Sequence, residues 1–165
     1  MRLVQRKLTM TIVMLTTIFT TTFIYHKTQS FNKIYYQGVK FLEADFPSRS
    51  LPFFESAYGM NPYHGPLIQN LIGVYEQLGL TNRIHFIIQD IENSVFKKNS
   101  WSHEEYLDLA YFFYKREYFS LAEIFFKMQI KKKTTLKVQQ DLAESLTWQK
   151  KYDEAISVYN DIVAT

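Results

Sequence analysis

Two patterns of apolar residues divide the chain. From Leu8 to Tyr25 no residue is charged and none is Pro or Gly, and Arg2, Arg6 and Lys7 precede the run. Further along, apolar residues instead recur at the steps of three and four that are typical of amphipathic helices. The sequence therefore predicts one apolar helix followed by a series of amphipathic helices.

The first pattern predicts a transmembrane helix at residues 8–25. The run of 18 residues lies at the short end of the roughly 17 to 25 that a hydrocarbon core requires. Seven of its residues are Thr, whose hydroxyls can donate to carbonyl oxygens one turn back. Because the basic residues come first, the positive-inside rule predicts a single-pass protein with residues 1–7 in the cytoplasm and the rest extracytoplasmic, facing the periplasm in a bacterium.

A cleaved signal peptide is the alternative, and it would release a secreted soluble binding module. No small-residue cleavage site of the Ala-x-Ala kind follows the apolar core, so an uncleaved signal anchor is favoured. Residues 26–30 then form a linker that contains no helix breaker. We expect the folded part, residues 31–165, to lie close to the bilayer.

The second pattern is an internal repeat. In its last copy two amphipathic helices meet at a turn at Lys150 and Lys151, and the small residues Ala143 and Ala155 stand where these helices would cross. Matching positions in the four copies are Ser50, Ile84, Ala122 and Ala155, spaced 34, 38 and 33 residues apart. The pattern predicts four helical hairpins, at about 31–64, 65–98, 103–134 and 135–165.

The last unit, from Ala143 through Tyr152-Asp153-Glu154-Ala155 to Tyr159, resembles a tetratricopeptide repeat, whose period is 34 residues. The resemblance covers roughly residues 31–165. It implies an all-α fold in which an N-terminal transmembrane helix is followed by about four hairpins that form a right-handed α-solenoid. In the second unit, Ile72 and Ile84 replace the small crossing residues, so we expect those helices to lie further apart.

Two local signals refine the helix boundaries. Pro52 would fall inside the second helix of the first unit if that helix began at Pro47. We therefore expect the helix to begin later, with Arg49 or Ser50 as its N-cap and Pro52 in its first turn. Asn99 or Ser102 is expected to cap the first helix of the third unit.

Charge and composition argue against nucleic-acid binding and catalysis. The net charge is only +3, from 19 basic and 16 acidic residues spread along the chain. Cys is absent, the four His residues share no metal-ligand spacing, and the chain contains no phosphate-binding loop or nucleophile elbow. We therefore expect no enzyme activity, catalytic residue, metal or cofactor. A small enzyme on a helical frame is the least favoured alternative.

The resemblance implies binding of other proteins, as peptides or helices, in a groove lined by the first helix of each hairpin. The groove residues that it implies are Tyr35, Val39, Gln69, Gly73, Glu76, Leu107, Tyr111, Tyr114, Gln140, Glu144 and Trp148. The alternative is that some of these side chains pack between hairpins. The predicted function is that of a membrane-anchored scaffold or adaptor in an envelope, secretion or polymer-export assembly.

The last hairpin carries more apolar residues than one neighbouring hairpin can cover. Ile156, Tyr159, Ile162 and Val163 lie on its second helix, and the pattern stops at Thr165. Repeat arrays require a terminal cap with a polar outer face. We therefore expect this surface to be a joint that is covered by a partner, by a second copy of the chain or by further residues.

Overall fold

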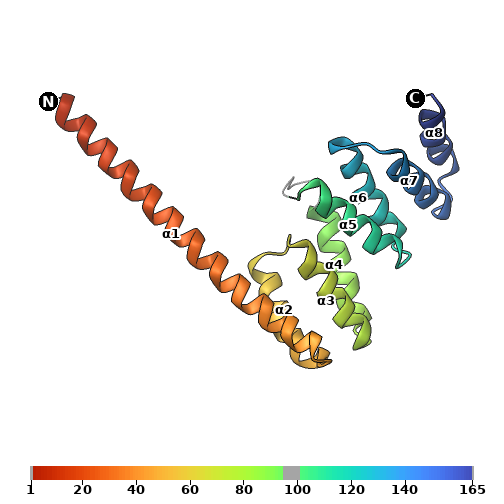
Figure 1. Ribbon diagram of the computed structural model, residues 1–165, viewed down its shortest axis with the longest axis horizontal. Helices are drawn as coiled ribbons and strands as arrows, with labels where there is room; N and C mark the ends of the chain where they lie inside the picture. Colours follow the sequence, from red (N-terminus) through yellow and green to blue (C-terminus); the bar gives the residue numbers. More distant parts are fainter. Residues whose placement is uncertain (1, 95–100, 165) are drawn as a thin grey trace. The chain divides into compact units, whose positions relative to one another are not determined.

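The part of the chain that the structure describes is helical and contains no strand, which confirms the all-α prediction. The computed structural model describes residues 2–94 and 101–164. In these residues the helices are α1 (Arg2–Glu43), α2 (Pro47–Met60), α3 (Gly65–Gln77), α4 (Thr81–Ser94), α5 (His103–Tyr114), α6 (Phe119–Lys132), α7 (Leu136–Trp148) and α8 (Tyr152–Val163) (Figure 1). The chain divides into two compact units, Met1–Pro62 with α1 and α2, and Tyr63–Thr165 with α3 to α8.

The long helix α1 runs unbroken through residues 8–25 and 26–30. The predicted membrane crossing, and with it the single-pass topology, is wrong, because no helix among the described residues combines the length and apolar character that a crossing requires. The physical reason is composition: threonines dilute the apolar side chains of α1, and His26 and Lys27 follow on the same helix. The Thr hydroxyls do donate to carbonyl oxygens one turn back, as expected.

In the first unit, α2 folds back against the C-terminal part of α1. A small residue makes this close approach possible, because a Cβ atom added at Gly38 would lie 2.7 Å from Cε1 of Phe54. The Phe54 ring is fully buried and also contacts the ring of Tyr35. It therefore has little freedom to move aside, and the two helices require glycine at this crossing.

The expectation that α2 begins after Pro47, with Arg49 or Ser50 as its N-cap, is wrong. The helix begins at Pro47 and contains Pro52 in its interior. Pro47 suits the first helical position, because its fixed φ angle matches the helix and its missing N–H has no partner there. Pro52 in turn removes one hydrogen bond from the second turn of the helix.

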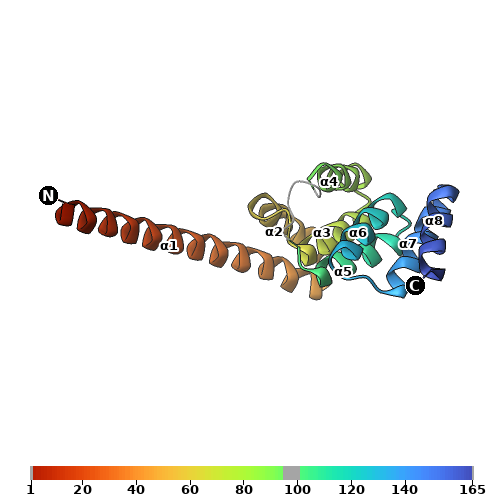
Figure 2. The same cartoon turned by 90° about the horizontal axis from the view of Figure 1, so that it is seen from above.

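The second unit contains three helical hairpins, in which α3 packs against α4, α5 against α6 and α7 against α8 (Figures 1 and 2). Contacts of α3 with α5 and of α6 with α7 join consecutive hairpins. The predicted crossing residues Ala122, Ala143 and Ala155 are all buried, and so is Ala110 on α5. The small residues thus lie where two helices of a hairpin meet.

The hairpin of α3 and α4 is more loosely joined than the other two in this unit. Ile72 on α3 and Ile84 on α4 are buried, and the two backbones come close at fewer positions. This agrees with the expectation that bulky residues at the crossing hold the helices apart. Residues 95–98 of the predicted second unit lie outside the described residues.

Each hairpin turns at a corner of the same backbone conformation. One residue per corner has a positive φ angle: Asp45 (62°), Gly79 (67°), Glu117 (63°) and Lys150 (62°). The residue after it donates its N–H to the carbonyl five residues earlier, as Tyr118 does to Phe113 at 3.0 Å. This is the Schellman closure of a helix C-terminus. The corner residues repeat at the same spacings of 34, 38 and 33 residues as the predicted crossing residues.

Buried aromatic rings hold the middle of the second unit together. Trp101 contacts the rings of Tyr106 and Phe125 at centroid distances of 5.7 and 5.5 Å. Its indole N–H donates to the backbone oxygen of Tyr63, and its own carbonyl accepts from Lys132 Nζ at 2.9 Å. The segment before α5 is thereby fixed against both α3 and α6.

Candidate functional site

The helices α3, α5 and α7 form the first arms of the three hairpins in the second unit, and each begins with a side-chain cap. At α5, Ser102 Oγ accepts the N–H of Glu105 at 3.2 Å, while the Glu105 carboxylate accepts the N–H of Ser102 at 2.8 Å. Ser102 is thus the cap, and Asn99 lies outside the described residues. Such a capping box satisfies two backbone donors and fixes where the helix begins.

At α3 the cap is a histidine, since Nδ1 of His64 accepts the N–H of Leu67 at 3.1 Å. Burial lowers the pKa of the His64 ring, although the nearby negative charge of Glu105 acts in the opposite direction. A lowered pKa keeps the ring neutral, and only the neutral ring has a nitrogen that can accept this hydrogen bond.

A shallow concave surface of about 760 Å³ extends across these three helices. Its lining side chains come from α3, from α5 and the turn after it, and from the start of α7. They are Gln69, Asp108, Tyr111, Phe112, Lys115, Arg116 and Lys137. We refer to this surface as the groove. It combines hydrogen-bond donors, an acceptor and two aromatic rings on one open face.

Inside the groove, Tyr111 joins α5 to α7. Its hydroxyl donates to Oδ2 of Asp141 at 2.6 Å, and Lys137 Nζ donates to Oδ1 of the same carboxylate at 2.6 Å. Burial, the hydrogen bond and the charge of Asp141 raise the pKa of Tyr111 well above its ordinary value. Asp141 is buried, so its charge is balanced by Lys137 and by the Tyr111 hydroxyl.

A second hydrogen bond between α5 and α7 joins Tyr114 to Glu144, about one turn further along both helices. Burial, followed by a hydrogen bond to Glu144 and its charge, raises the pKa of Tyr114 to about 12. The Tyr114 ring contacts Phe119 edge to face at 5.7 Å, and Phe119 in turn stacks on Trp148 at 5.8 Å with an interplanar angle of 8°. Trp148 nevertheless remains 63% exposed, so its outer face is open to a ligand.

At the opposite side of the groove, Arg116 joins the turn after α5 to α3. Its Nε donates to the two carboxylate oxygens of Glu76 at 3.0 and 3.1 Å. The guanidinium also lies 3.8 Å from the ring centroid of Phe112. Because both partners of this ion pair are about one-third exposed, it contributes little stability and mainly positions charge at the groove.

A scan against models of known protein families and a search of curated proteins both returned no match. Function therefore has to be argued from the geometry. Among the described residues, no group of three or more His, Cys, Asp or Glu side chains is placed to hold a metal ion. The groove presents hydrogen-bond donors, acceptors and aromatic rings on one open face.

The structure brings several of the predicted groove residues together. Gln69 and Tyr111 line the groove, Glu76 contacts it through Arg116, and Tyr114, Glu144 and Trp148 form a cluster on α5 and α7. Tyr111 and Tyr114 also connect neighbouring hairpins, which was the stated alternative for such side chains. Tyr111 thus both lines the groove and packs between two hairpins.

The other predicted groove residues are not among the side chains that line the groove. On α3, a Cβ added at Gly73 would meet no atom within 4 Å; Leu107 on α5 is half-buried, and Gln140 on α7 is exposed. In the first unit, Tyr35 is buried against Phe31 and Phe54, and Val39 is half-buried. Tyr35 therefore belongs to the interior of its own hairpin.

The sequence did not indicate Phe112, Lys115, Arg116 or Lys137 as groove residues, or Asp141 as the partner of Tyr111. One signal was available, because Lys137 and Asp141 are four residues apart and so lie on one face of a helix. The burial of Asp141 beneath Tyr111 had no such signal, since it depends on how α5 and α7 meet.

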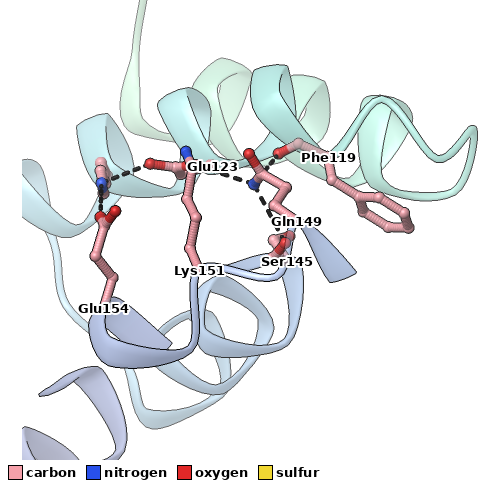
Figure 3. Close-up of polar contacts among 7 residues, drawn as sticks. Phe119, Glu123, Ser145, Gln149, Lys151 and Glu154 are labelled. Atoms are coloured by element: carbon pink, nitrogen blue, oxygen red, sulfur yellow. Dashed lines mark hydrogen bonds and ion pairs between the residues drawn. The ribbon is translucent and has the colours of Figure 1, made fainter. Parts of the chain in front are cut away.

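A buried carboxylate on α6 holds the last hairpin in place (Figure 3). Glu123 accepts from Lys127 at 2.6 Å, from Lys151 at 2.7 Å and from Gln149 Nε2 at 2.9 Å. Burial alone would raise the pKa of Glu123, but the hydrogen bonds from Lys127, Lys151 and Gln149 outweigh burial and lower it. The Gln149 amide also donates to the Phe119 carbonyl at 3.1 Å. The corner between α7 and α8 is thereby attached to α6.

The predicted C-terminal joint is exposed on α8. Ile156, Tyr159 and Val163 are 56%, 43% and 86% exposed, and Ile162 is half-buried. Residues at steps of three and four lie on one side of a helix. The exposed side chains therefore form one apolar row, which we call the α8 row.

Proposed function

We propose that this chain is a scaffold of tetratricopeptide-like hairpins that binds an extended segment of another protein in the groove. The observation that carries the proposal is that the first helices of three consecutive hairpins contribute to one open concave surface. Capture of an extended peptide requires such a surface, because the ligand must contact several helices in succession.

The repeated corner supports the tetratricopeptide part of the proposal. The left-handed corner residue precedes the crossing residue by the same number of positions in every hairpin, as Glu117 precedes Ala122 and Lys150 precedes Ala155. The mean spacing is close to the 34-residue period of the family. By this proposal the three hairpins of the second unit stack with the right-handed twist of an α-solenoid, which a crystal structure of the protein tests.

The chemistry of the groove suits a polypeptide backbone. Gln69 and Lys115 supply donors, Asp108 supplies an acceptor, and the Tyr111 ring supplies a flat apolar surface. Positive and negative side chains are mixed, so binding does not depend on one strong charge on the ligand. Exposed aromatic rings such as Trp148 are frequent anchors in protein interfaces.

Site-specific cross-linking in cells tests the proposal. A photoreactive residue at Gln69 or Lys115 should capture a partner protein, whereas the same residue at exposed Phe86 on α4 should not. Adding Lys115→Glu to the Gln69 probe should reduce the captured partner at least about tenfold, while Lys131→Glu at the exposed end of α6 should not. Equal capture from Phe86, or capture that Lys115→Glu leaves unchanged, would contradict the proposal.

A further inference from the structure

Beside the groove, the hydroxyl of Tyr114 on α5 contacts two side chains of α7. The Trp148 indole N–H donates to the Tyr114 oxygen, and the Tyr114 O–H donates to the Glu144 carboxylate. Because both groups contact the same hydroxyl, the indole nitrogen and the nearest carboxylate oxygen lie within about 6 Å of each other. The indole N–H already has its partner, so what Trp148 offers a ligand is the face of its ring.

The Trp148 indole is held in place without being covered. It stacks on Phe119 at a centroid distance of 5.8 Å, yet 63% of Trp148 is exposed, and Glu144 is exposed as well. A carboxylate has about four acceptor positions, of which the Tyr114 hydroxyl uses one. Among the described residues, no cation lies over the Trp148 ring and none forms an ion pair with Glu144.

The same chain shows which side chain fits an aromatic ring together with a carboxylate. The guanidinium of Arg116 lies 3.8 Å from the ring centroid of Phe112, and its Nε donates to both carboxylate oxygens of Glu76. The ring face attracts the positive charge and the planar group stacks on it, while the carboxylate accepts its N–H groups. Trp148 and Glu144 present the same two kinds of group without an arginine.

We propose that the Trp148 ring face and the Glu144 carboxylate form a subsite for an arginine side chain of the segment bound in the groove. This inference rests on the proposed function, because it assigns one side chain of that ligand. The subsite adjoins the groove, since Tyr114 follows the groove residue Tyr111 by about 4.5 Å along α5. We call it the arginine subsite.

The chemistry of the subsite favours arginine over other side chains. An apolar side chain would cover the Glu144 carboxylate without offering a hydrogen bond, which is unfavourable. Lysine supplies the charge, but it has no planar group to stack on Trp148 and no pair of parallel N–H groups for the carboxylate. Because the groove itself carries charges of both signs, this subsite is where the charge of the ligand is selected.

Peptides selected on the immobilised full chain from a random display library test the inference, and they should contain an arginine. Replacing this arginine with citrulline should weaken binding at least about tenfold, measured by fluorescence anisotropy, because citrulline keeps the planar shape and lacks the charge. Replacing it with lysine should weaken binding at least about threefold. These changes leave the protein untouched, so its folding does not affect the comparison.

Variants of the chain identify where the arginine binds. Glu144→Gln and Trp148→Leu should each weaken the arginine peptides at least about tenfold and leave the citrulline peptides nearly unchanged, since the lost contact is specific to the arginine. The matched controls Glu104→Gln, at an exposed residue of α5, and Phe86→Leu, at an exposed residue of α4, should change neither. Bound arginine peptide should also protect Trp148 from acrylamide quenching, because the other tryptophan, Trp101, is only 2% exposed.

The inference is overturned if the selected peptides contain no arginine, if citrulline binds as well as arginine, or if Glu144→Gln leaves binding unchanged. The groove proposal stands in each case if Lys115→Glu still weakens the peptides. Peptides that respond to Glu144→Gln but not to Lys115→Glu support the arginine subsite and contradict the groove proposal. Peptides that respond to neither variant overturn both.

Discussion

The hydroxyl of Tyr111 on α5 lies 2.6 Å from Oδ2 of Asp141 on α7, and the carboxylate that accepts this hydrogen bond is buried. One tyrosine therefore both lines the groove and joins two hairpins. Any partner that binds along α5 and α7 contacts a surface that this hydrogen bond holds in place.

Tyr111→Phe should lower the free energy of unfolding by about 1.5–3 kcal/mol, because a buried charged acceptor loses a donor. Urea denaturation monitored by circular dichroism measures the change. Tyr159→Phe is the control, since Tyr159 is 43% exposed and loss of its hydroxyl should cost less than about 0.5 kcal/mol. Similar losses in the two variants would show that the Tyr111 hydrogen bond adds nothing to stability.

Gly38→Ala should destabilise the first hairpin by about 1–3 kcal/mol, because the new Cβ would overlap the buried Phe54 ring. Gly59→Ala is a matched control on α2, where a Cβ meets nothing within 4 Å. There the better helix propensity of alanine should leave stability unchanged or increased. Thermal unfolding of both variants measures the two effects on stability. If Gly38→Ala leaves the stability unchanged, α1 and α2 cross less closely than described.

Lys150→Gly should stabilise the chain by about 0.5–1 kcal/mol. A non-glycine residue at a φ of 62° is strained by about 1–2 kcal/mol, and part of the relief is offset by the greater freedom of glycine in the unfolded chain. Gly79→Ala, at a φ of 67°, should have the opposite effect. Gln140→Gly in the interior of α7 should destabilise by roughly 0.5–1 kcal/mol. Glycine that destabilises at Lys150 as well would argue against a left-handed corner there.

The stability that Glu123 contributes should disappear in acid. Its pKa is lowered in the folded chain from the usual 4.5, so the unfolded chain takes up this proton first as the pH falls. The contribution is complete above about pH 4.5 and is lost as the pH falls through the lower folded pKa.

Comparison with Glu123→Gln measures this contribution. The difference in unfolding free energy between the two proteins should be constant from about pH 7 to pH 5 and should shrink below that. A difference that stays constant down to pH 3 would show that the ionised carboxylate is not what attaches the last hairpin. Lys150→Gln, a charge change at the same corner outside this contact, is the control.

Much of the local structure was predictable from the sequence. Apolar residues at steps of three and four predicted the helices, and small residues such as Ala122 and Ala155 predicted where hairpin helices cross, because both depend on neighbours along one or two helices. Ser102, which caps α5, was one of the two residues that the sequence offered as its cap. The left-handed corners were harder to predict from the sequence, because only Gly79 among the four corner residues is a glycine.

The site required the tertiary structure. Whether Tyr111 is a free anchor or a bridge depends on Asp141, which lies 30 residues away and is brought to it only when the hairpin of α7 and α8 packs on the hairpin of α5 and α6. The burial of Glu123 likewise depends on Gln149 and Lys151, which lie 26 and 28 residues away along the chain. Sequence periodicity specifies the apolar face of a helix; the neighbours that occupy this face are decided by packing between segments distant along the chain.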